Sequence, residues 1–305
     1  MTDLTVVIPV YNQSDALALT LHGFTVQPEP YRRTPIIVVD DGSSEPIGSV
    51  VHSFSDKLNL TYKRLERCGR AAARNQGAAE ADGGIVVFCD ADRIPAPQFL
   101  QAHHQTHLQS DDALVIGQVR EIYVSDIVAE RERVLAYWAD HRKQRIPQYC
   151  RLVYRLYDEW GRASPTVPWI SAFSGNMSIR KERFAALGGF DEGFREWGFE
   201  HFEFGYRAYQ QGVPYRYHPQ AANIHLAHRR SGPPYEELIR RSHQYFLQKH
   251  PDLVVEKFLD FMLGQVSLQE LVQCVQEQDH LSAAQGTYDP LVVEREPLYV
   301  RITNF

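Results

Sequence analysis

The chain has 305 residues, of which 44% are apolar, and a formal charge of −6 at pH 7. That length and apolar content are sufficient for a full buried core without disulfide support. A net negative charge excludes a general nucleic-acid-binding protein, because affinity for the phosphate backbone needs accumulated Lys and Arg. The four cysteines include no CxxC pair, so we expect them to be reduced and structural.

The N-terminus and the apolar runs bear on where the protein works. The first residues read MTDLTVVIPVYN and contain no basic region of the signal-peptide type. No later run approaches the ~20 apolar residues that a membrane span needs. We therefore expect a soluble, cytoplasmic protein without a transmembrane segment.

Short β-branched runs alternate with helical patterns in the first half of the chain, which is typical of parallel βαβ units. Continuous apolar runs predict strands at Thr5–Val10, Ile36–Val39, Ile85–Cys89 and Ala113–Ile116. Helices are expected at Ser14–Val26 and at the Ala-rich segment Arg70–Asp82. The pattern predicts an α/β fold with a mostly parallel sheet flanked by helices.

The second half of the chain predicts an insertion and a helical extension. A loose basic and aromatic stretch at 122–168 is interpreted as an insertion near the binding pocket. Helices are then expected at Glu182–Leu187, Glu200–Gln211, Tyr235–Lys249 and Leu253–Val275. We therefore predict a main domain at 1–232 and a helical C-terminal extension at 233–305, which packs on the main domain or forms a homo-oligomer.

Polar side chains follow each of the first three predicted strands. They are Tyr11-Asn12, Asp40-Asp41-Gly42-Ser43 and Asp90-Ala91-Asp92. Ligands of open α/β sheets bind where the carboxyl ends of the strands meet. Asp90 and Asp92, two positions apart, can turn their oxygens toward one Mg²⁺ or Mn²⁺ ion, and such ions share their coordination shell with substrate phosphates. These clusters predict a pocket for a phosphorylated ligand and a metal.

Four segments in this order carry a resemblance to a known family: VVIPVYN, VVDDGSS, GRAAARNQG and FCDAD. Over roughly residues 4–100 they resemble the GT-A glycosyltransferases, most closely those of family 2. Residues 176–207, NMSIRKERFAALGGFDEGFREWGFEHFEFGYR, resemble the C-terminal half of the galactosyltransferase and polypeptide GalNAc-transferase type. The resemblance implies a GT-A fold and the transfer of a sugar from a nucleotide-sugar, first of all a UDP-sugar, to a glycan, peptide or small-molecule acceptor.

The resemblance also implies roles for single residues. Those placed against the nucleotide-sugar are Pro9, Tyr11, Asp40 or Asp41, Arg70, Arg74, Asp90, Ala91, Gly175, Asn176 and Trp197. Asp92, with Asp90 beside it, would hold a Mn²⁺ or Mg²⁺ ion that bridges the diphosphate. A downstream histidine would complete the metal shell, and we favour His228 over His225 because its flanking sequence, Ala-His-Arg-Arg, is closer to the family pattern.

The catalytic base is the point at which the sequence departs from the resemblance. Inverting members carry Trp-Gly-Gly-Glu-Asp, whose Asp removes the acceptor proton. Here the matching run is Trp197-Gly198-Phe199-Glu200-His201. We favour inversion with Glu200 or His201 as the base. The alternative is a site that resembles the retaining GalNAc-transferases, which also lack that Asp.

Two other classes of function remain as alternatives. A non-catalytic module that binds a nucleotide-sugar or glycan would explain the missing Asp. A sugar nucleotidyltransferase is disfavoured, because Pro9-Val10-Tyr11-Asn12 stands where such enzymes carry a Gly-rich phosphate loop. Release of UDP, tight binding without turnover, and release of pyrophosphate would distinguish the three classes.

Overall fold

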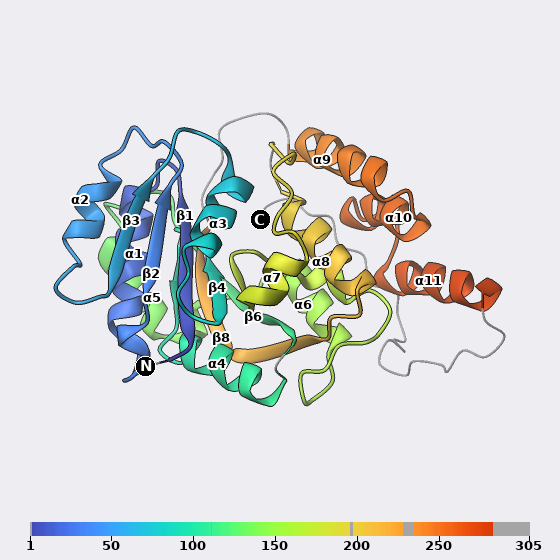
Figure 1. Ribbon diagram of the computed structural model, residues 1–305, viewed down its shortest axis with the longest axis horizontal. Helices are drawn as coiled ribbons and strands as arrows, with labels where there is room; N and C mark the ends of the chain where they lie inside the picture. The colour runs from blue at the N-terminus through green and yellow to red at the C-terminus, as the bar shows by residue number, and fades with distance from the viewer. Residues whose placement is uncertain (1, 111, 196–197, 228–234, 283–305) are drawn as a thin grey trace.

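The computed structural model describes residues 2–110, 112–195, 198–227 and 235–282, which form one sheet flanked by helices (Figure 1). Within these residues the sheet has eight strands in the order β3-β2-β1-β4-β7-β6-β8-β5. The strands are β1 Leu4–Val10, β2 Ile36–Asp40, β3 Leu60–Arg64, β4 Ile85–Cys89, β5 Arg93–Pro95, β6 Leu114–Tyr123, β7 Asn176–Arg180 and β8 Tyr215–Ala227. The α-helices are α1 Ser14–Thr25, α2 Ile47–His52, α3 Arg70–Ala79, α4 Phe99–Gln109, α5 Arg131–Ala139, α6 Gln148–Val153, α7 Lys181–Ala186, α8 Glu200–Gln210, α9 Tyr235–Lys249, α10 Leu253–Met262 and α11 Leu268–Ser282.

The sheet is mixed, with both parallel and antiparallel strand pairs. Strand β1 pairs in parallel with β2 and β4, and β2 pairs in parallel with β3. Strand β7 lies antiparallel between β4 and β6, and β5 is antiparallel to β8. Strand β8 is parallel to β6. The prediction of a mostly parallel sheet therefore holds for β1 to β4 and for the β6–β8 pair. The antiparallel positions of β7 and β5 were not predicted, since an apolar run shows that a strand is covered but not the direction of its neighbour.

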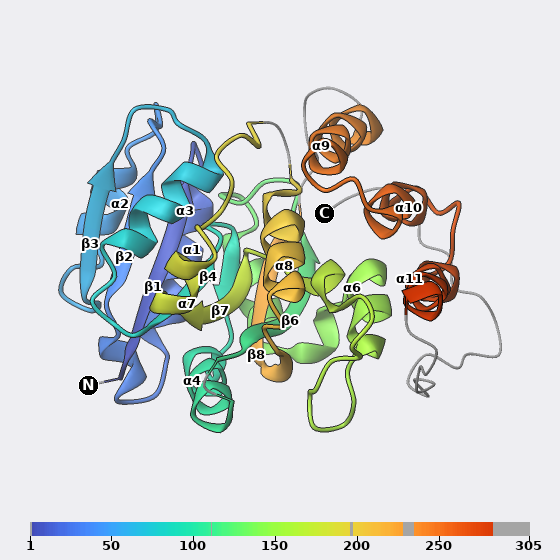
Figure 2. The ribbon, with the colours of Figure 1, turned by 45° about the vertical axis from the view of Figure 1, so that its right-hand side comes forward.

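The parallel strands are covered by helices on both faces, which explains their continuous apolar runs. Successive side chains of a strand point to opposite faces. Val7 of β1 packs in one cluster with residues of α3, α7 and α8, whereas Val6 and Ile8 pack in another with residues of α1, α2 and α4. Figure 2 shows α3 and α7 together on one face of the sheet.

The C-terminal helices share their core with the main domain. Trp169 is fully buried, and its ring lies 5.8 Å from that of Phe246 in α9 and 4.8 Å from that of Phe258 in α10. Figures 1 and 2 both place α9, α10 and α11 beside α8 and α6, on the side of the molecule far from β3. Packing on the main domain is thus one confirmed role of the extension.

The predicted helical segment Leu253–Val275 is two helices. Helix α10 ends at Met262, and Gly264 adopts a left-handed φ of 71° that stops it. Ser267 then starts α11 in a reciprocal cap with Glu270: the Glu270 carboxylate accepts from Ser267 N at 2.7 Å, and Ser267 Oγ accepts from Glu270 N at 3.2 Å. Among the described residues, no helix is both long and apolar enough to cross a membrane.

Candidate functional site

The three polar clusters predicted from the sequence meet at one edge of the sheet, beyond the carboxyl ends of β1, β2 and β4. Asn12, just after β1, accepts a hydrogen bond from Ser44 N at 2.8 Å, and its own N–H donates to Ser43 Oγ at 2.9 Å. Gln13 donates from Nε2 to Asp92 Oδ2 at 3.2 Å, beyond the end of β4. Contacts between the loops thus confirm that the clusters come together.

The two acidic residues after β2 have different environments. Asp40 is fully buried, and it accepts hydrogen bonds from Ser43 N at 2.8 Å and from the Tyr62 hydroxyl at 2.7 Å. Asp41 accepts from Cys68 N at 2.6 Å and Gly69 N at 3.1 Å, which anchors the loop before α3. Asp41 is also buried, at 5% exposed. Contact of Asp40 or Asp41 with the nucleoside therefore stays a prediction.

A cation covers the aromatic ring that we predict to contact the nucleoside. Tyr11 is 38% exposed, and the guanidinium carbon of Arg67 lies 3.5 Å from its ring centroid. This is close cation–π contact. Arg67 was not predicted from the sequence, because the Tyr11–Arg67 contact joins two loops 56 positions apart.

Asp90 is bound between two arginines. Its Oδ1 accepts from Arg74 Nη2 at 2.7 Å, and its Oδ2 accepts from Arg93 Nε at 3.3 Å. Burial alone would raise the pKa of Asp90, but the charges of Arg74 and Arg93 outweigh it and lower that pKa. Arg74 itself is only 2% exposed, so it is a buried ion-pair residue rather than a charge on the helix surface.

Asp92 lies against a histidine from a distant strand. Strand β5 pairs antiparallel with β8, with Arg93 opposite His225, and this pairing brings His225 Nε2 to 3.6 Å from Asp92 Oδ2. Burial would raise the pKa of Asp92, but His225 and Arg93 lower it, so the carboxylate is charged at neutral pH. The arrangement gives one carboxylate and one imidazole pointing toward each other.

Asp92 and His225 suit a divalent ion whose remaining ligands are substrate phosphates. Within the described residues there is no group of three His, Cys, Asp or Glu side chains that could hold a metal by themselves. Mg²⁺-type sites commonly use one or two carboxylates together with substrate phosphates. Asp92 and His225 suit that role, whereas both oxygens of Asp90 already bind arginines. His228 lies outside the described residues.

The predicted base region is connected to the acidic triplet through Arg74. Its Nη1 donates to Glu200 Oε1 at 2.9 Å at the start of α8. Glu200 is 1% exposed; burial would raise its pKa, but His201 and Arg74 lower it, which makes Glu200 a weak base. His201 is 15% exposed, and its Nδ1 lies 3.7 Å from Glu200 Oε1.

Gly175 packs against the Asp90–Arg93 pair, and Asn176 follows it as the first residue of β7. A Cβ on Gly175 would lie 2.3 Å from both Asp90 Oδ2 and Arg93 Nε, so only glycine fits there. Asn176 is fully buried, and its Nδ2 donates to the carbonyls of Gln118 at 3.1 Å and Ala221 at 3.0 Å. The amide of Asn176 thus bonds within the fold, and its contact with the ligand stays a prediction.

The other predicted residues differ in accessibility. Pro9 is buried within β1, and Ala91 is buried, its carbonyl accepting from Thr20 Oγ1 at 2.8 Å. Arg70 is exposed at the first position of α3, and its charge is among those that lower the pKa of Glu200. Trp197 lies outside the described residues. Arg70, Trp197 and His228 remain predictions.

Fold and site together define a GT-A glycosyltransferase, and comparisons with known proteins support this class. Residues 5–161 match the model of glycosyl transferase family 2, and residues 156–229 match the model described as the N-terminal domain of galactosyltransferase. The chain belongs to glycosyl transferase family 2. It is an enzyme of the transferase class.

Named relatives are similar over most of the chain. Validoxylamine A glucosyltransferase of Streptomyces hygroscopicus subsp. jinggangensis is 28% identical over 273 residues, covering 84% of this chain and 63% of the relative. Chondroitin synthase of Escherichia coli is 28% identical over 242 residues, covering 70% of this chain and 33% of the relative. The chain thus spans less than two thirds of the length of these relatives.

Solved structures share the fold. GalNAc-T7 with UDP, GalNAc and Mn²⁺ has a TM-score of 0.59 at 17% identity, with 90% of this chain and 55% of that chain covered. S. aureus TarS 1-349 with UDP-GlcNAc has a TM-score of 0.57 at 18% identity, with 87% and 72% covered. A mannosyltransferase of Pyrobaculum calidifontis with GDP-Man and Mn²⁺ has a TM-score of 0.57 at 19% identity, with 94% and 76% covered.

Proposed function

We propose that the protein transfers a sugar from a nucleotide-sugar, preferentially a UDP-sugar, to a hydroxyl group of its acceptor. The observation that carries the proposal is the Asp92–His225 pair at the sheet edge where the loops after β1, β2 and β4 meet. Solved structures of the same fold hold UDP-GlcNAc, or a nucleotide and Mn²⁺, which supports the choice of ligand.

Asp92 and His225 would hold a Mn²⁺ or Mg²⁺ ion, and when bound the ion supplies charge neutralisation for the departing diphosphate. The charged carboxylate of Asp92 and the oxygen-rich donor phosphates suit hard cations of this kind. His228 is a further candidate ligand. Asp90 instead fixes Arg74 and Arg93 beneath the site.

His201 is the proposed base of an inverting reaction, with Glu200 in a supporting position. Glu200 is buried and paired with Arg74, and its lowered pKa makes it a poor proton acceptor. His201 is partly exposed at the first turn of α8 and has its Nδ1 toward Glu200. Imidazole is well suited to accept a proton near neutral pH.

The reaction then balances without another reactant. The acceptor oxygen forms the new bond to the anomeric carbon, and the bond from that carbon to the phosphate oxygen breaks. The electron pair leaves with the nucleoside diphosphate, and the acceptor proton moves to the ring nitrogen of His201. Tyr11 and Asp41 are the proposed contacts of the nucleoside, and Trp197 is a proposed contact of the sugar or acceptor.

The experiment that tests this function is a screen of nucleotide-sugars by thermal shift with Mn²⁺, followed by an assay of UDP release. We expect one UDP-sugar to stabilise the protein beyond UDP alone, and UDP release to depend on metal and acceptor. Asp92→Ala should abolish this release and leave the fold intact, because Asp92 lies at a strand end. Full activity of Asp92→Ala would refute the proposal, as would pyrophosphate release from NTP and a sugar phosphate.

A further inference from the structure

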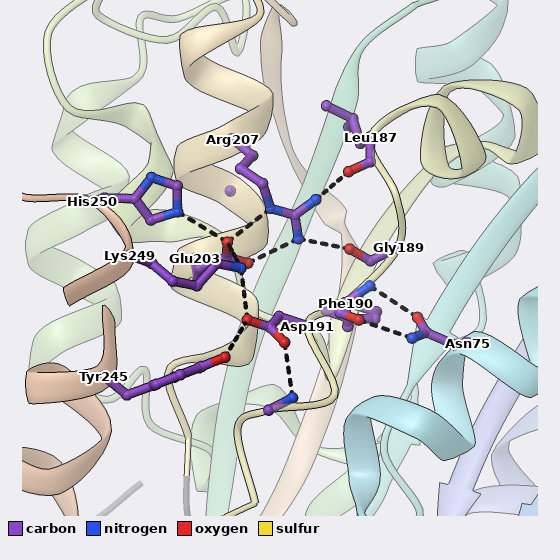
Figure 3. A network of polar contacts seen from close by, with 12 residues as sticks. Asn75, Leu187, Gly189, Phe190, Asp191, Glu203, Arg207, Tyr245, Lys249 and His250 are labelled. Atoms are coloured by element: carbon purple, nitrogen blue, oxygen red, sulfur yellow. Dashed lines mark hydrogen bonds and ion pairs between the residues drawn. The ribbon is translucent and has the colours of Figure 1, made fainter. Parts of the chain in front are cut away.

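A polar network behind the site joins the C-terminal extension to the segment that precedes α8 (Figure 3). Its centre is Glu203, which is fully buried one turn after Glu200. The Glu203 carboxylate accepts from Arg207 Nε at 2.8 Å, from Lys249 Nζ at 2.9 Å and from His250 Nε2 at 3.0 Å. Lys249 and His250 come from the end of α9, so α8 and the extension share one buried carboxylate.

Arg207 connects Glu203 to the backbone of segment 187–193, which follows α7. Its Nη2 donates to the Gly189 carbonyl at 2.6 Å, and its Nη1 donates to the Leu187 carbonyl. Gly188 and Gly189 have left-handed φ values of 84° and 67°, so the chain turns sharply here. The carbonyls that this turn leaves outside regular structure are thereby satisfied by one side chain.

Asp191 provides a second connection between the segment and α9. Its carboxylate accepts from Lys249 Nζ at 2.6 Å and from the Tyr245 hydroxyl at 3.0 Å, and it also accepts from Gly193 N at 2.8 Å within the segment. Lys249 therefore bridges Asp191 of the segment and Glu203 of α8. Figure 3 shows the Lys249 amine between these two carboxylates.

Helix α3 holds the same segment from the other side. Asn75 donates from Nδ2 to the Phe190 carbonyl at 2.8 Å and accepts from Phe190 N at 2.9 Å. Its neighbour Arg74 binds both Asp90 and Glu200 in the candidate active site. Segment 187–193 is thus fixed to the two helices that position the site, α3 and α8, and Lys249 and Tyr245 of α9 complete the attachment.

The network joins the buried carboxylate of Glu203 to Lys249, whose side chain is 35% exposed. Ion pairs with an exposed partner add little to stability, whereas ionic groups can specify one geometry. We propose that Lys249 is a positioning residue for sugar transfer. It ties segment 187–193 to α8, so that the first turn of α8, with Glu200 and His201, is held in the orientation that the reaction needs. The C-terminal extension is then a part of the catalytic unit. This inference rests on the proposed function.

The test compares Lys249→Met with the conservative Lys249→Arg and with Lys257→Met. The last is a control at a lysine of similar exposure, which removes the partly buried Lys257–Asp260 ion pair of the same extension. In Lys249→Met we expect amide hydrogen exchange to accelerate in 187–193 and kcat to fall roughly 10- to 100-fold, since misplacement by about 1 Å can cost 10²-fold. The Kd for UDP should be unchanged. Lys249→Arg should restore much of the activity, and Lys257→Met should behave as wild type.

Unchanged exchange in 187–193, or faster exchange with an unchanged kcat, would overturn the proposal. Equal loss of UDP binding and turnover would also overturn it, since that result indicates general structural damage. If Lys249→Met does not fold, Tyr245→Phe, which removes one hydroxyl from the same attachment, takes its place with the same expected direction. A wild-type protein that turns over no donor refutes the proposed function instead, and the exchange measurement still decides whether Lys249 holds the segment.

Discussion

Removal of the Arg74 charge is the perturbation for which the structure gives the clearest energetic prediction. Arg74 and Glu200 are 2% and 1% exposed, and Asp90 is the second partner of Arg74. Breaking a buried ion pair by removing one partner costs about 3–5 kcal/mol, because the other charge stays buried without compensation. Arg74→Met should therefore lower the melting temperature by roughly 6–10 °C, at about 2 °C per kcal/mol for a large domain.

The loss of stability in Arg74→Met should depend on pH in a defined direction. The pKa of Glu200 is lowered in the folded protein, so its charged form adds stability above the ordinary glutamate pKa of about 4.3, and this contribution is lost as the pH falls through the folded value. Without Arg74 the pKa of Glu200 rises. Protonation of Glu200 then removes the cost of burying its unpaired charge. The difference in unfolding free energy between Arg74→Met and wild type should therefore become smaller from pH 7 toward pH 5.

Chemical denaturation across this pH range, on the single variants and on the double variant Arg74→Met/Glu200→Gln, measures both effects. The double variant should be more stable than Arg74→Met alone, because it no longer buries an unpaired carboxylate. A loss below about 1 kcal/mol in Arg74→Met would refute the reasoning, given the 3–5 kcal/mol expected of a buried pair. A penalty that grows toward low pH would refute it as well.

Two further predictions concern binding and proton transfer. His201→Asn should leave UDP affinity unchanged and lower turnover by about 10²- to 10⁴-fold, the usual contribution of a general base; wild-type turnover would place the base elsewhere. Arg67→Ala should tighten UDP binding about 2- to 5-fold in titration calorimetry, since the base must replace an exposed cation–π contact worth about 0.5–1 kcal/mol on the face of Tyr11. Weaker binding would instead mean that Arg67 contacts the nucleotide.

Local patterns predicted β1, β2 and β4 closely, but they missed the edge strand β3, which has no continuous apolar run. The predicted strand at Ile85–Cys89 coincides with β4, and β1 and β2 each differ from their predicted ranges by one residue. These strands are covered on both faces, so their apolar runs are uninterrupted. The polar residues that follow them could be placed at one edge because parallel strands share their direction.

Strand β8 was missed because its sequence contains signals against a strand. Pro219 lies within it, and proline removes a donor from the ladder. The structure accommodates this with a register shift opposite β6, where Gly117 pairs with His218 but Val119 pairs with Asn223. His225 reaches Asp92 only because β8 returns beside β5, and no local pattern specifies that pairing.

The ion-pair partners of the charged site residues could not be predicted from the sequence either. The resemblance placed Arg74 against the nucleotide-sugar, but Arg74 is buried, because Asp90 and Glu200, 16 and 126 positions away, both bind it. The network around Glu203 likewise joins residues 46 and 47 positions apart. Contacts at these separations depend on the packing of α3, α8 and α9, which periodicity within each helix cannot reveal.

Our central proposal is that nucleotide-sugar transfer by this protein uses a divalent ion and that Asp92 and His225 together hold it. Electron paramagnetic resonance of Mn²⁺ with UDP present measures this directly, because binding to the protein removes the signal of the free hydrated ion. We predict stoichiometric binding by the wild type and by His218→Ala, a control on the same strand as His225, and weak binding by Asp92→Ala and His225→Ala. Wild-type Mn²⁺ affinity in both Asp92→Ala and His225→Ala would contradict the account.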